Sequence, residues 1–365
     1  MTPLTLVAHN GARVYGGAER YLVRLLRRLQ DRGHRVVLLC RDETVAGPAR
    51  ALGVATEIGR VGGHASLHHA ARLAAQLRRH RPDAVLLGTF KKTWLGAMGA
   101  RLARVPRVVA RIGLATDMPS RSVLYQVAFR RWIDRVVVNA TDLTGPVWAA
   151  LEGAAEERVV LIRNAVDAPA RTLPAGALRR QLGIPAAAPV VGAVARLVRQ
   201  KRLELLVRGA ARLEGVCCVI AGDGPERAPL ERLAAELGIG ERVRFLGHRE
   251  AIGDVLDALD LFVVTSHVEG MSNAMLEALA AGVPVLSTPV SGAAEALEPL
   301  DDGRVPGEVV AASEEALAGR LRALLGDPAA LASMGAAART RALERFAWPD
   351  ALERWEAVLS GAPLP

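Results

Sequence analysis

Two glutamates in the second half of the chain, Glu269 and Glu277, are separated by seven residues. The residues between them start with a small polar turn at 270–273 that is predicted to open a helix. The first turn of a helix leaves backbone N–H groups unpaired and carries the positive end of the helix dipole, and together these bind phosphate. The flanking carboxylates can accept hydrogen bonds from hydroxyl groups. This combination predicts a site for a phosphate that carries a sugar, as in a nucleotide sugar.

Two basic residues upstream, Arg196 and Lys201, could supply the positive charge that such a ligand needs. Lys201 is one of only three lysines among 47 basic residues, beside Lys91 and Lys92. In a chain that otherwise uses arginine, a retained lysine indicates that a compact ammonium is needed there. Positive charge at such a position would neutralise a diphosphate and stabilise it as a leaving group. The alternative is a solvated basic start of a helix.

The glutamate pair resembles the E-x7-E signature of the family-4 glycosyltransferases, retaining enzymes with two facing Rossmann-like domains. Further segments resemble motifs of the same family, in family order and at family spacing. They are Gly16-Gly17-Ala18-Glu19, Asn164-Ala165-Val166-Asp167, Arg196-Leu197-x-x-x-Lys201, Gly222-Asp223-Gly224-Pro225 and Phe245-Leu246-Gly247. The resemblance covers nearly the whole chain, and the ordered set is more specific than any single motif.

The resemblance implies a retaining glycosyltransferase that moves a hexose from a UDP- or GDP-sugar to a glycan or lipid-linked acceptor, in bacterial cell-envelope or exopolysaccharide synthesis. It implies catalytic roles for Arg196, Lys201 and Glu269. The donor contacts that it implies are Gly16, Gly17, Gly222, Phe245, Leu246, Gly270, Met271, Ser272, Asn273 and Glu277. No D-x-D sequence occurs, so we expect neither a metal nor another cofactor.

One departure from the family pattern concerns the acceptor side. Many relatives carry a histidine near the sugar at the end of a strand in the first domain, whereas this chain has Arg111-Ile112-Gly113 there. We expect Arg111 or Asp117 to contact donor or acceptor instead, with Lys91 and Lys92 on the same side. In the chemistry usually described for the family, the leaving phosphate helps to deprotonate the acceptor, so no protein nucleophile is needed.

Alternating short apolar strands and amphipathic helices predict the elements that hold these residues. In the first half, strands are expected at 4–8, 36–40, 84–87, 108–112 and 136–139, with helices at 18–32 and 66–80. In the second half, strands are expected at 190–194, 216–221, 243–246, 261–265 and from 285, with helices at 202–213, 226–237 and 269–281. This alternation predicts two doubly wound α/β domains with parallel sheets, whose strand ends carry the motifs.

These elements divide the chain into four expected parts. They are an acceptor-binding domain at 1–167, a linker at 168–189, a donor-binding domain at 190–345 and a last helix at 346–365 that crosses back to the first domain. The linker is inferred from its content of Pro, Ala and Gly. By resemblance, the two Rossmann-like domains face each other across a cleft, which is the GT-B architecture.

The positive charge of the chain is concentrated in its first half. Residues 1–165 carry 26 Lys and Arg against 12 Asp and Glu, whereas residues 166–365 carry 21 against 26. A basic first half favours an anionic partner, such as a membrane surface, a lipid pyrophosphate or an acidic glycan. Nucleic acid is not expected, because no nucleic-acid-binding motif occurs and only 4% of the residues are aromatic.

Residues 119–135 combine aromatic and basic side chains. Tyr125, Phe129 and Trp132 have the spacing of one helical face, and several arginines surround them: Arg121, Arg130, Arg131 and Arg135. Two interpretations remain open. The aromatic face packs against the core, or the helix docks on anionic lipid and brings the enzyme to a lipid-linked acceptor.

The three cysteines have no metal-ligand spacing, no apolar run is long enough to span a membrane, and no signal peptide is evident. A cytoplasmic protein is expected, with peripheral attachment to the inner face of the cytoplasmic membrane left open.

Two other functions fit the same architecture. A nucleotide-sugar 2-epimerase would change the sugar without an acceptor. A non-catalytic binding partner would hold a nucleotide sugar without turning it over. The joint presence of Arg196, Lys201, Glu269 and Glu277 argues against the non-catalytic alternative.

Overall fold

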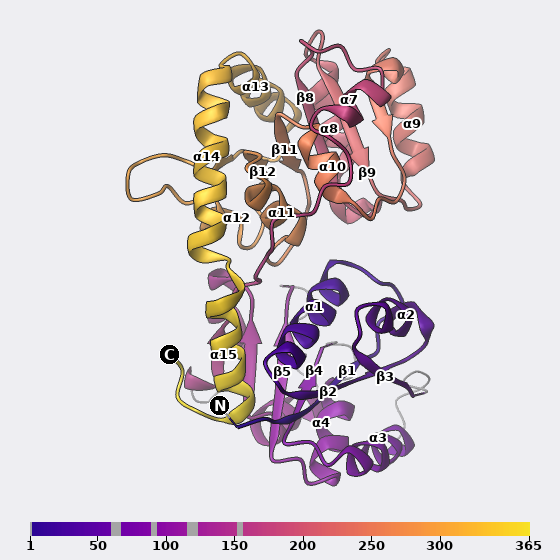
Figure 1. The fold of residues 1–365 in the computed structure, drawn as a ribbon, viewed down its shortest axis with the longest axis vertical. Helices are drawn as coiled ribbons and strands as arrows, with labels where there is room; N and C mark the ends of the chain where they lie inside the picture. The colour runs from indigo at the N-terminus through magenta and orange to yellow at the C-terminus, as the bar shows by residue number, and fades with distance from the viewer. Residues whose placement is uncertain (1, 60–66, 89–92, 115–122, 152–155) are drawn as a thin grey trace. The chain divides into compact units, whose positions relative to one another are not determined.

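The computed structural model describes residues 2–59, 67–88, 93–114, 123–151 and 156–365, which form two compact units (Figure 1). Unit 1 comprises Met1–Asn164 and Trp348–Pro365, and unit 2 comprises Ala165–Ala347. Each unit has a parallel sheet flanked by helices. The predicted pair of Rossmann-like α/β folds is therefore confirmed.

Within the described residues, the sheet of unit 1 has seven parallel strands in the order β3-β2-β1-β4-β5-β6-β7. The strands are β1 (Thr5–Asn10), β2 (Arg35–Cys40), β3 (Ala55–Ile58), β4 (Ala84–Leu87), β5 (Arg107–Ile112), β6 (Arg135–Val138) and β7 (Val159–Leu161). Strands covered on both faces need apolar side chains at successive positions, and every residue of β4 is buried. The strand order reverses between β1 and β4, which is where ligands bind in open α/β sheets, at the carboxyl ends of the strands.

The helices of unit 1 come from both ends of the chain. They are α1 (Gly17–Asp31), α2 (Glu43–Ala51), α3 (Leu67–His80), α4 (Thr93–Leu102), α5 (Val123–Val127), α6 (Thr144–Ala150) and α15 (Trp348–Ser360). The C-terminal helix α15 packs on α1: the rings of Tyr21 and Trp348 stack with centroids 5.5 Å apart, and Trp355 Nε1 donates to the Tyr21 hydroxyl at 3.2 Å. The last helix thus belongs to unit 1.

The prediction that Tyr125, Phe129 and Trp132 share one face of a regular α-helix is wrong in part. The α-helix ends at Val127, and a π-helical turn, Ala128–Trp132, follows it and changes the spacing of the side chains. Phe129 is fully buried and stacks on Tyr125, with centroids 6.5 Å apart. Of the two interpretations left open, the core-packing one therefore holds for Phe129.

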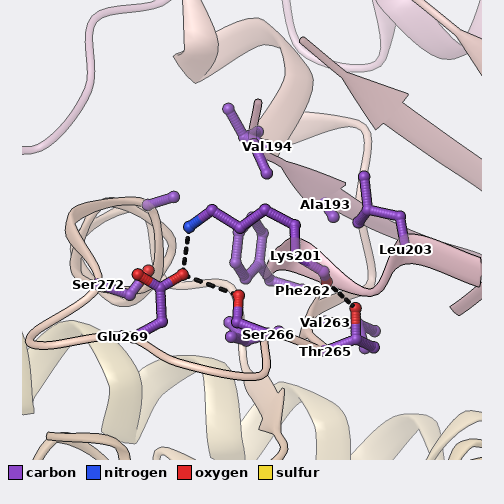
Figure 2. Close-up of a pocket in the computed structure, with 13 residues that line it drawn as sticks. Ala193, Val194, Lys201, Leu203, Phe262, Val263, Thr265, Ser266, Glu269 and Ser272 are labelled. Carbon is purple, nitrogen blue, oxygen red and sulfur yellow. Dashed lines mark hydrogen bonds and ion pairs between the residues drawn. The ribbon is translucent and has the colours of Figure 1, made fainter. Parts of the chain in front are cut away.

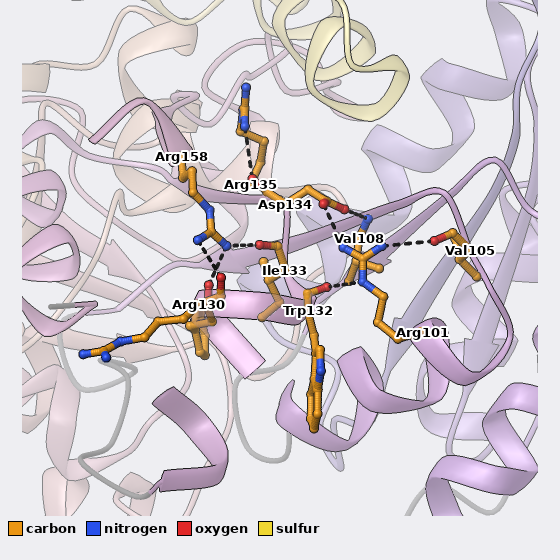
Figure 3. A network of polar contacts seen from close by, with 10 residues as sticks. Arg101, Val105, Val108, Arg130, Trp132, Ile133, Asp134, Arg135 and Arg158 are labelled. Carbon is orange, nitrogen blue, oxygen red and sulfur yellow. Dashed lines mark hydrogen bonds and ion pairs between the residues drawn. The ribbon is translucent and has the colours of Figure 1, made fainter. Parts of the chain in front are cut away.

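Two arginines fix the end of this π-helical turn (Figure 3). Arg158 donates to the carbonyls of Phe129 (2.6 Å), Arg130 (3.0 Å) and Ile133. Arg101 donates to the carbonyl of Trp132 at 3.0 Å and to Asp134 Oδ1 at 2.7 Å. The last carbonyls of a helix have no partner inside the helix, so these guanidinium groups satisfy them and hold the turn in place.

The sheet of unit 2 has six parallel strands within the described residues, in the order β10-β9-β8-β11-β12-β13. The strands are β8 (Val190–Val194), β9 (Cys217–Ala221), β10 (Val243–Phe245), β11 (Leu261–Val264), β12 (Val285–Ser287) and β13 (Gly307–Val309). The helices are α7 (Ala177–Gln181), α8 (Leu203–Ala211), α9 (Arg227–Glu236), α10 (Ile252–Asp257), α11 (Asn273–Ala281), α12 (Ala293–Ala296), α13 (Glu314–Leu325) and α14 (Pro328–Arg345). Here the strand order reverses between β8 and β11.

The segment expected to be a linker, 168–189, is a packed part of unit 2. Asp254 accepts hydrogen bonds from the Thr172 N–H (2.8 Å), the Thr172 hydroxyl (2.6 Å) and the Leu173 N–H (3.0 Å). Asp257 accepts from the Gly176 N–H at 2.8 Å. The Pro, Ala and Gly content marks an irregular backbone, but carboxylates of α10 satisfy its N–H groups and dock it.

None of the helices in the described part of the chain combines the length and the apolar character that a membrane crossing requires.

Candidate functional site

Lys201 and Glu269 meet beyond the carboxyl ends of the neighbouring strands β8 and β11 (Figure 2). The Lys201 ammonium donates to Glu269 Oε1, and Ser266 Oγ donates to the same oxygen at 2.8 Å. The Lys201 and Glu269 side chains are only 20% and 10% exposed. The pair thus lies at the reversal point of the sheet, where ligands bind in this kind of fold. The structure brings together two of the three residues predicted to be catalytic.

Hydrogen bonds between two loops hold this pair in register. The Gln200 carbonyl accepts from the His267 N–H at 2.8 Å, and Gln200 Nε2 donates to the Val268 carbonyl at 2.7 Å. The Thr265 hydroxyl donates to the Lys201 carbonyl at 2.8 Å. Sequence reasoning missed Gln200, Thr265 and Ser266, and their only signal is that they are polar residues beside the motif residues Lys201 and Glu269.

A pocket opens next to the pair. Its lining includes Lys201, Ser266, Glu269, Ser272 and Ala274, with apolar residues of β8 and β11 as its floor (Figure 2). Ser272 Oγ accepts from the Met275 N–H at 3.5 Å, as an N-cap does, so α11 starts at Asn273 rather than at Glu269 as expected. Glu269 therefore lies in the loop before the helix.

The remaining residues of the glutamate motif lie at or inside α11. Gly270 and Met271 are buried in the loop before Ser272, and Asn273 is the first residue of the helix. Glu277 is inside the helix and only 4% exposed. The seven-residue spacing thus places one carboxylate in front of the helix N-terminus and the other one turn beyond Asn273.

Arg196 lies in the loop after β8 and is exposed. Its neighbours on both sides are pinned, because Ala195 donates its N–H to the Ala221 carbonyl at 3.0 Å and Leu197 donates its N–H to the Asp223 carbonyl at 2.9 Å. Gly222 approaches this loop so closely that a Cβ would lie 1.9 Å from the Ala195 carbonyl oxygen. Gly222 therefore sets the position of the Arg196 loop through backbone packing.

Phe245 and Leu246 are not among the residues that line the pocket. Phe245 ends β10 and packs against the apolar core of unit 2, and the Leu246 N–H donates to the Ile220 carbonyl at 2.9 Å. Both are partly buried.

In unit 1, Gly16 is the N-cap of α1 and donates its N–H to Glu19 Oε2 at 3.1 Å, and Gly17 is the first helical residue. Arg111 is 8% exposed, lies over the Tyr21 ring at 4.8 Å and donates to Asn164 Oδ1 at 2.8 Å. These contacts anchor Arg111 inside unit 1. Lys91, Lys92 and Asp117 lie outside the described residues.

The chain matches two family descriptions that together cover most of its length. Residues 15–168 match "Glycosyltransferase Family 4", and residues 175–341 match "Glycosyl transferases group 1". The 2-deoxystreptamine glucosyltransferase of Streptomyces kanamyceticus is 30% identical over 281 residues, 70% of this chain and 71% of that protein. The lipopolysaccharide core biosynthesis glycosyltransferase LpsE of Rhizobium meliloti is 43% identical over 114 residues, 31% of this chain and 34% of that protein.

A solved structure shows the same fold over nearly all of this chain. The crystal structure of Anabaena Alr3699/HepE in complex with UDP superposes with a TM-score of 0.85 at 23% identity, over 98% of this chain and 100% of that one. The order of the motifs, the two parallel sheets and these matches agree with one another. The chain belongs to the family-4 glycosyltransferases.

Proposed function

We propose that this glycosyltransferase is a retaining, metal-independent enzyme that transfers a hexose from a UDP- or GDP-sugar to a glycan or lipid-linked acceptor. Bacterial cell-envelope or exopolysaccharide synthesis is the setting we propose. The observation that carries the proposal is the Lys201–Glu269 pair beside the N-terminus of α11. The lipopolysaccharide role in the name of LpsE and the UDP in the HepE structure support the proposed setting and donor.

The proposed chemistry follows from what the two charges can do. A diphosphate competes with Glu269 for the Lys201 ammonium, and its charge is stabilised there as the bond between the sugar C1 and the phosphate oxygen breaks. Glu269, once released, accepts hydrogen bonds from sugar hydroxyls, while Glu277 holds the ribose diol. The acceptor oxygen bonds to C1 on the face that the phosphate leaves, and the acceptor proton passes to the departing nucleoside diphosphate.

We also propose that unit 1 contacts an anionic membrane. Val123 and Leu124 on α5 are 74% and 46% exposed, and Arg130 and Arg131 in the following turn are exposed as well. Apolar side chains next to basic ones suit the boundary between lipid tails and anionic headgroups. The excess of Lys and Arg in residues 1–165 supports this partner.

A thermal-shift panel tests the donor. UDP, GDP, ADP and their glucose or mannose conjugates are compared in the presence of EDTA, because a ligand at 100 times its Kd stabilises by about 2.7 kcal/mol. We expect a shift with UDP or GDP compounds, followed by sugar transfer with an unchanged anomeric configuration by NMR. Activity lost in EDTA and restored by a divalent cation would contradict metal independence, and a 2-epimer formed without acceptor would identify an epimerase.

A further inference from the structure

His9 lies near the carboxyl end of β1, the strand at which the strand order of unit 1 reverses. Its partners in the two neighbouring strands are Leu39 of β2 and Leu87 of β4. Residues in register on adjacent strands point to the same face of a sheet, so the His9 ring stands between these two leucines. His9 therefore lies next to the strand ends at which a ligand of unit 1 is expected.

The two side chains that flank the ring are apolar. Leu39 and Leu87 are buried, and α4 covers this face closely, since a Cβ on Gly96 would lie 2.8 Å from Leu87 Cδ2. His9 itself is half-buried, so part of the ring stays within reach of solvent. Burial lowers the pKa of His9 to about 4. At neutral pH the imidazole is uncharged, and one ring nitrogen accepts a hydrogen bond while the other donates.

Histidines with a purely structural role in unit 1 look different. His34 is buried with both nitrogens engaged: Nδ1 accepts from the Leu4 N–H at 3.1 Å, and Nε2 lies 3.0 Å from Glu356 Oε1. His80 Nε2 lies 2.8 Å from Glu57 Oε2. At His9, the hydrogen bond that the described residues show is to its backbone carbonyl, from the Gly88 N–H at 3.0 Å. Within the part of the chain that the structure describes, no hydrogen bond of the His9 ring itself is seen.

We propose that His9 is an acceptor-binding residue, whose unprotonated ring nitrogen accepts a hydrogen bond from a hydroxyl of a sugar or polyol acceptor. The assignment rests on the proposed transferase function. It adds a histidine contact to the acceptor, and the sequence motifs contain no histidine in that role. A neutral nitrogen between apolar side chains orients the hydroxyl by accepting a hydrogen bond from it. The nitrogen does not take the proton, which leaves with the nucleoside diphosphate.

The test compares His9→Gln, which keeps a hydrogen-bond acceptor, with His9→Phe, which keeps the apolar packing but not the acceptor. His68→Gln, at an exposed position of α3, is the matched control. Turnover of the nucleotide sugar that binds most tightly is measured with 2-deoxystreptamine, methyl α-glucoside, octyl β-glucoside or water, whichever the wild type uses fastest. We expect transfer by His9→Phe to fall at least tenfold, His9→Gln to stay within about threefold, and His68→Gln to match the wild type.

Two further readouts separate an acceptor contact from a structural role. The Kd for the nucleoside diphosphate should be the same in all variants, and the ratio of acceptor KM between wild type and His9→Gln should be flat from pH 5.5 to 8. A KM ratio that changes near pH 6.5 would contradict the neutral ring. Transfer by His9→Phe at the wild-type rate would overturn the His9 assignment and leave the proposed function standing. Wild-type protein that turns over no nucleotide sugar would instead contradict the proposed function, and the His9 assignment with it.

Discussion

The Lys201 ammonium donates to a carboxylate oxygen of Glu269 across 68 residues of sequence, and Ser266 shares the same oxygen. The two charges neutralise each other in a site that is largely closed to water. The ion pair therefore stabilises the site. A charged donor can also separate the two groups and interact with them.

The ion pair can be tested with a double-mutant cycle. Lys201→Met keeps most of the length of the side chain and removes its charge, so we expect a rate loss of about 10- to 100-fold, equivalent to about 1.5–3 kcal/mol. It also leaves Glu269 without its cation in a mostly buried place, which should cost about 1–3 kcal/mol of unfolding free energy. Adding Glu269→Gln should restore the melting temperature but not the activity.

The cycle has two outcomes that would contradict this view. A Lys201→Met protein with wild-type turnover would remove Lys201 from catalysis. A double mutant as unstable as Lys201→Met would show that the two side chains do not depend on each other for stability.

Gly222 and Gly319 make a matched pair of glycine substitutions. Gly222 has a φ of +131°, and a Cβ there would lie 1.9 Å from the Ala195 carbonyl oxygen. Gly222→Ala must displace the loop that carries Arg196, and we expect a loss of more than about 3 kcal/mol in unfolding free energy. Gly319 is exposed within α13 and has no atom within 4 Å of its Cβ position. Gly319→Ala should stabilise by about 0.5–1 kcal/mol. Denaturant melts followed by circular dichroism compare the two, and an equal effect of both substitutions would contradict the packing argument.

Asp254 should make unit 2 sensitive to acid. Burial alone would raise the pKa of Asp254, but hydrogen bonds from Thr172 and Leu173 outweigh it and lower the pKa below its usual value of 3.8. A carboxyl whose folded pKa is lower than its unfolded pKa stabilises the fold above the unfolded value, and this contribution is lost as the pH falls through the folded value. Asp254→Asn should therefore lower the melting temperature at pH 7 and reduce its further fall between pH 5 and pH 2. If the melting temperature of the wild type fell no more steeply with falling pH than that of Asp254→Asn, this role would be refuted.

Much of the architecture could be predicted because buried parallel strands need uninterrupted apolar residues, and the expected strand at 84–87 coincides with β4. The elements that were not predicted are those in which this run of apolar residues is short or absent. Edge strand β3 has no buried residue, and β7 and β13 are three residues long. Helix α2 contains Pro48, which usually indicates a turn, yet Asp42 caps its first turn by accepting from the Thr44 N–H at 3.1 Å.

The residues of the site also divide into those that the sequence reveals and those that it does not. Lys201 and Glu269 carry the charge and could be found by residue type and spacing. Gln200, Thr265 and Ser266 position that pair through backbone and hydroxyl contacts, which depend on two loops meeting in three dimensions. His9 depends on the reversal of the strand order, which no local pattern reveals.

The cysteines should report on unfolding. Cys40, Cys217 and Cys218 are free and buried, and burial raises the pKa of Cys40 to about 11 and that of Cys218 to about 12. The reactive form of cysteine is the thiolate, so we expect little reaction with an aromatic disulfide reagent at pH 8 in the native protein, and three thiols in denaturant. Rapid reaction of a native thiol would contradict the burial of that cysteine.

Membrane attachment can be tested at Val123 and Leu124. We expect the protein to sediment with vesicles of anionic phosphatidylglycerol at low salt, and to be released at 0.5 M salt as the headgroup charges are screened. Val123→Glu/Leu124→Glu places two carboxylates against the anionic surface and should weaken binding at least tenfold. Leu343→Glu is the control, since Leu343 is equally prominent at 70% exposure but lies in the acidic second half of the chain. Equal vesicle binding by the double variant and the control would remove α5 from the membrane contact, and no binding by the wild type would refute the contact as a whole.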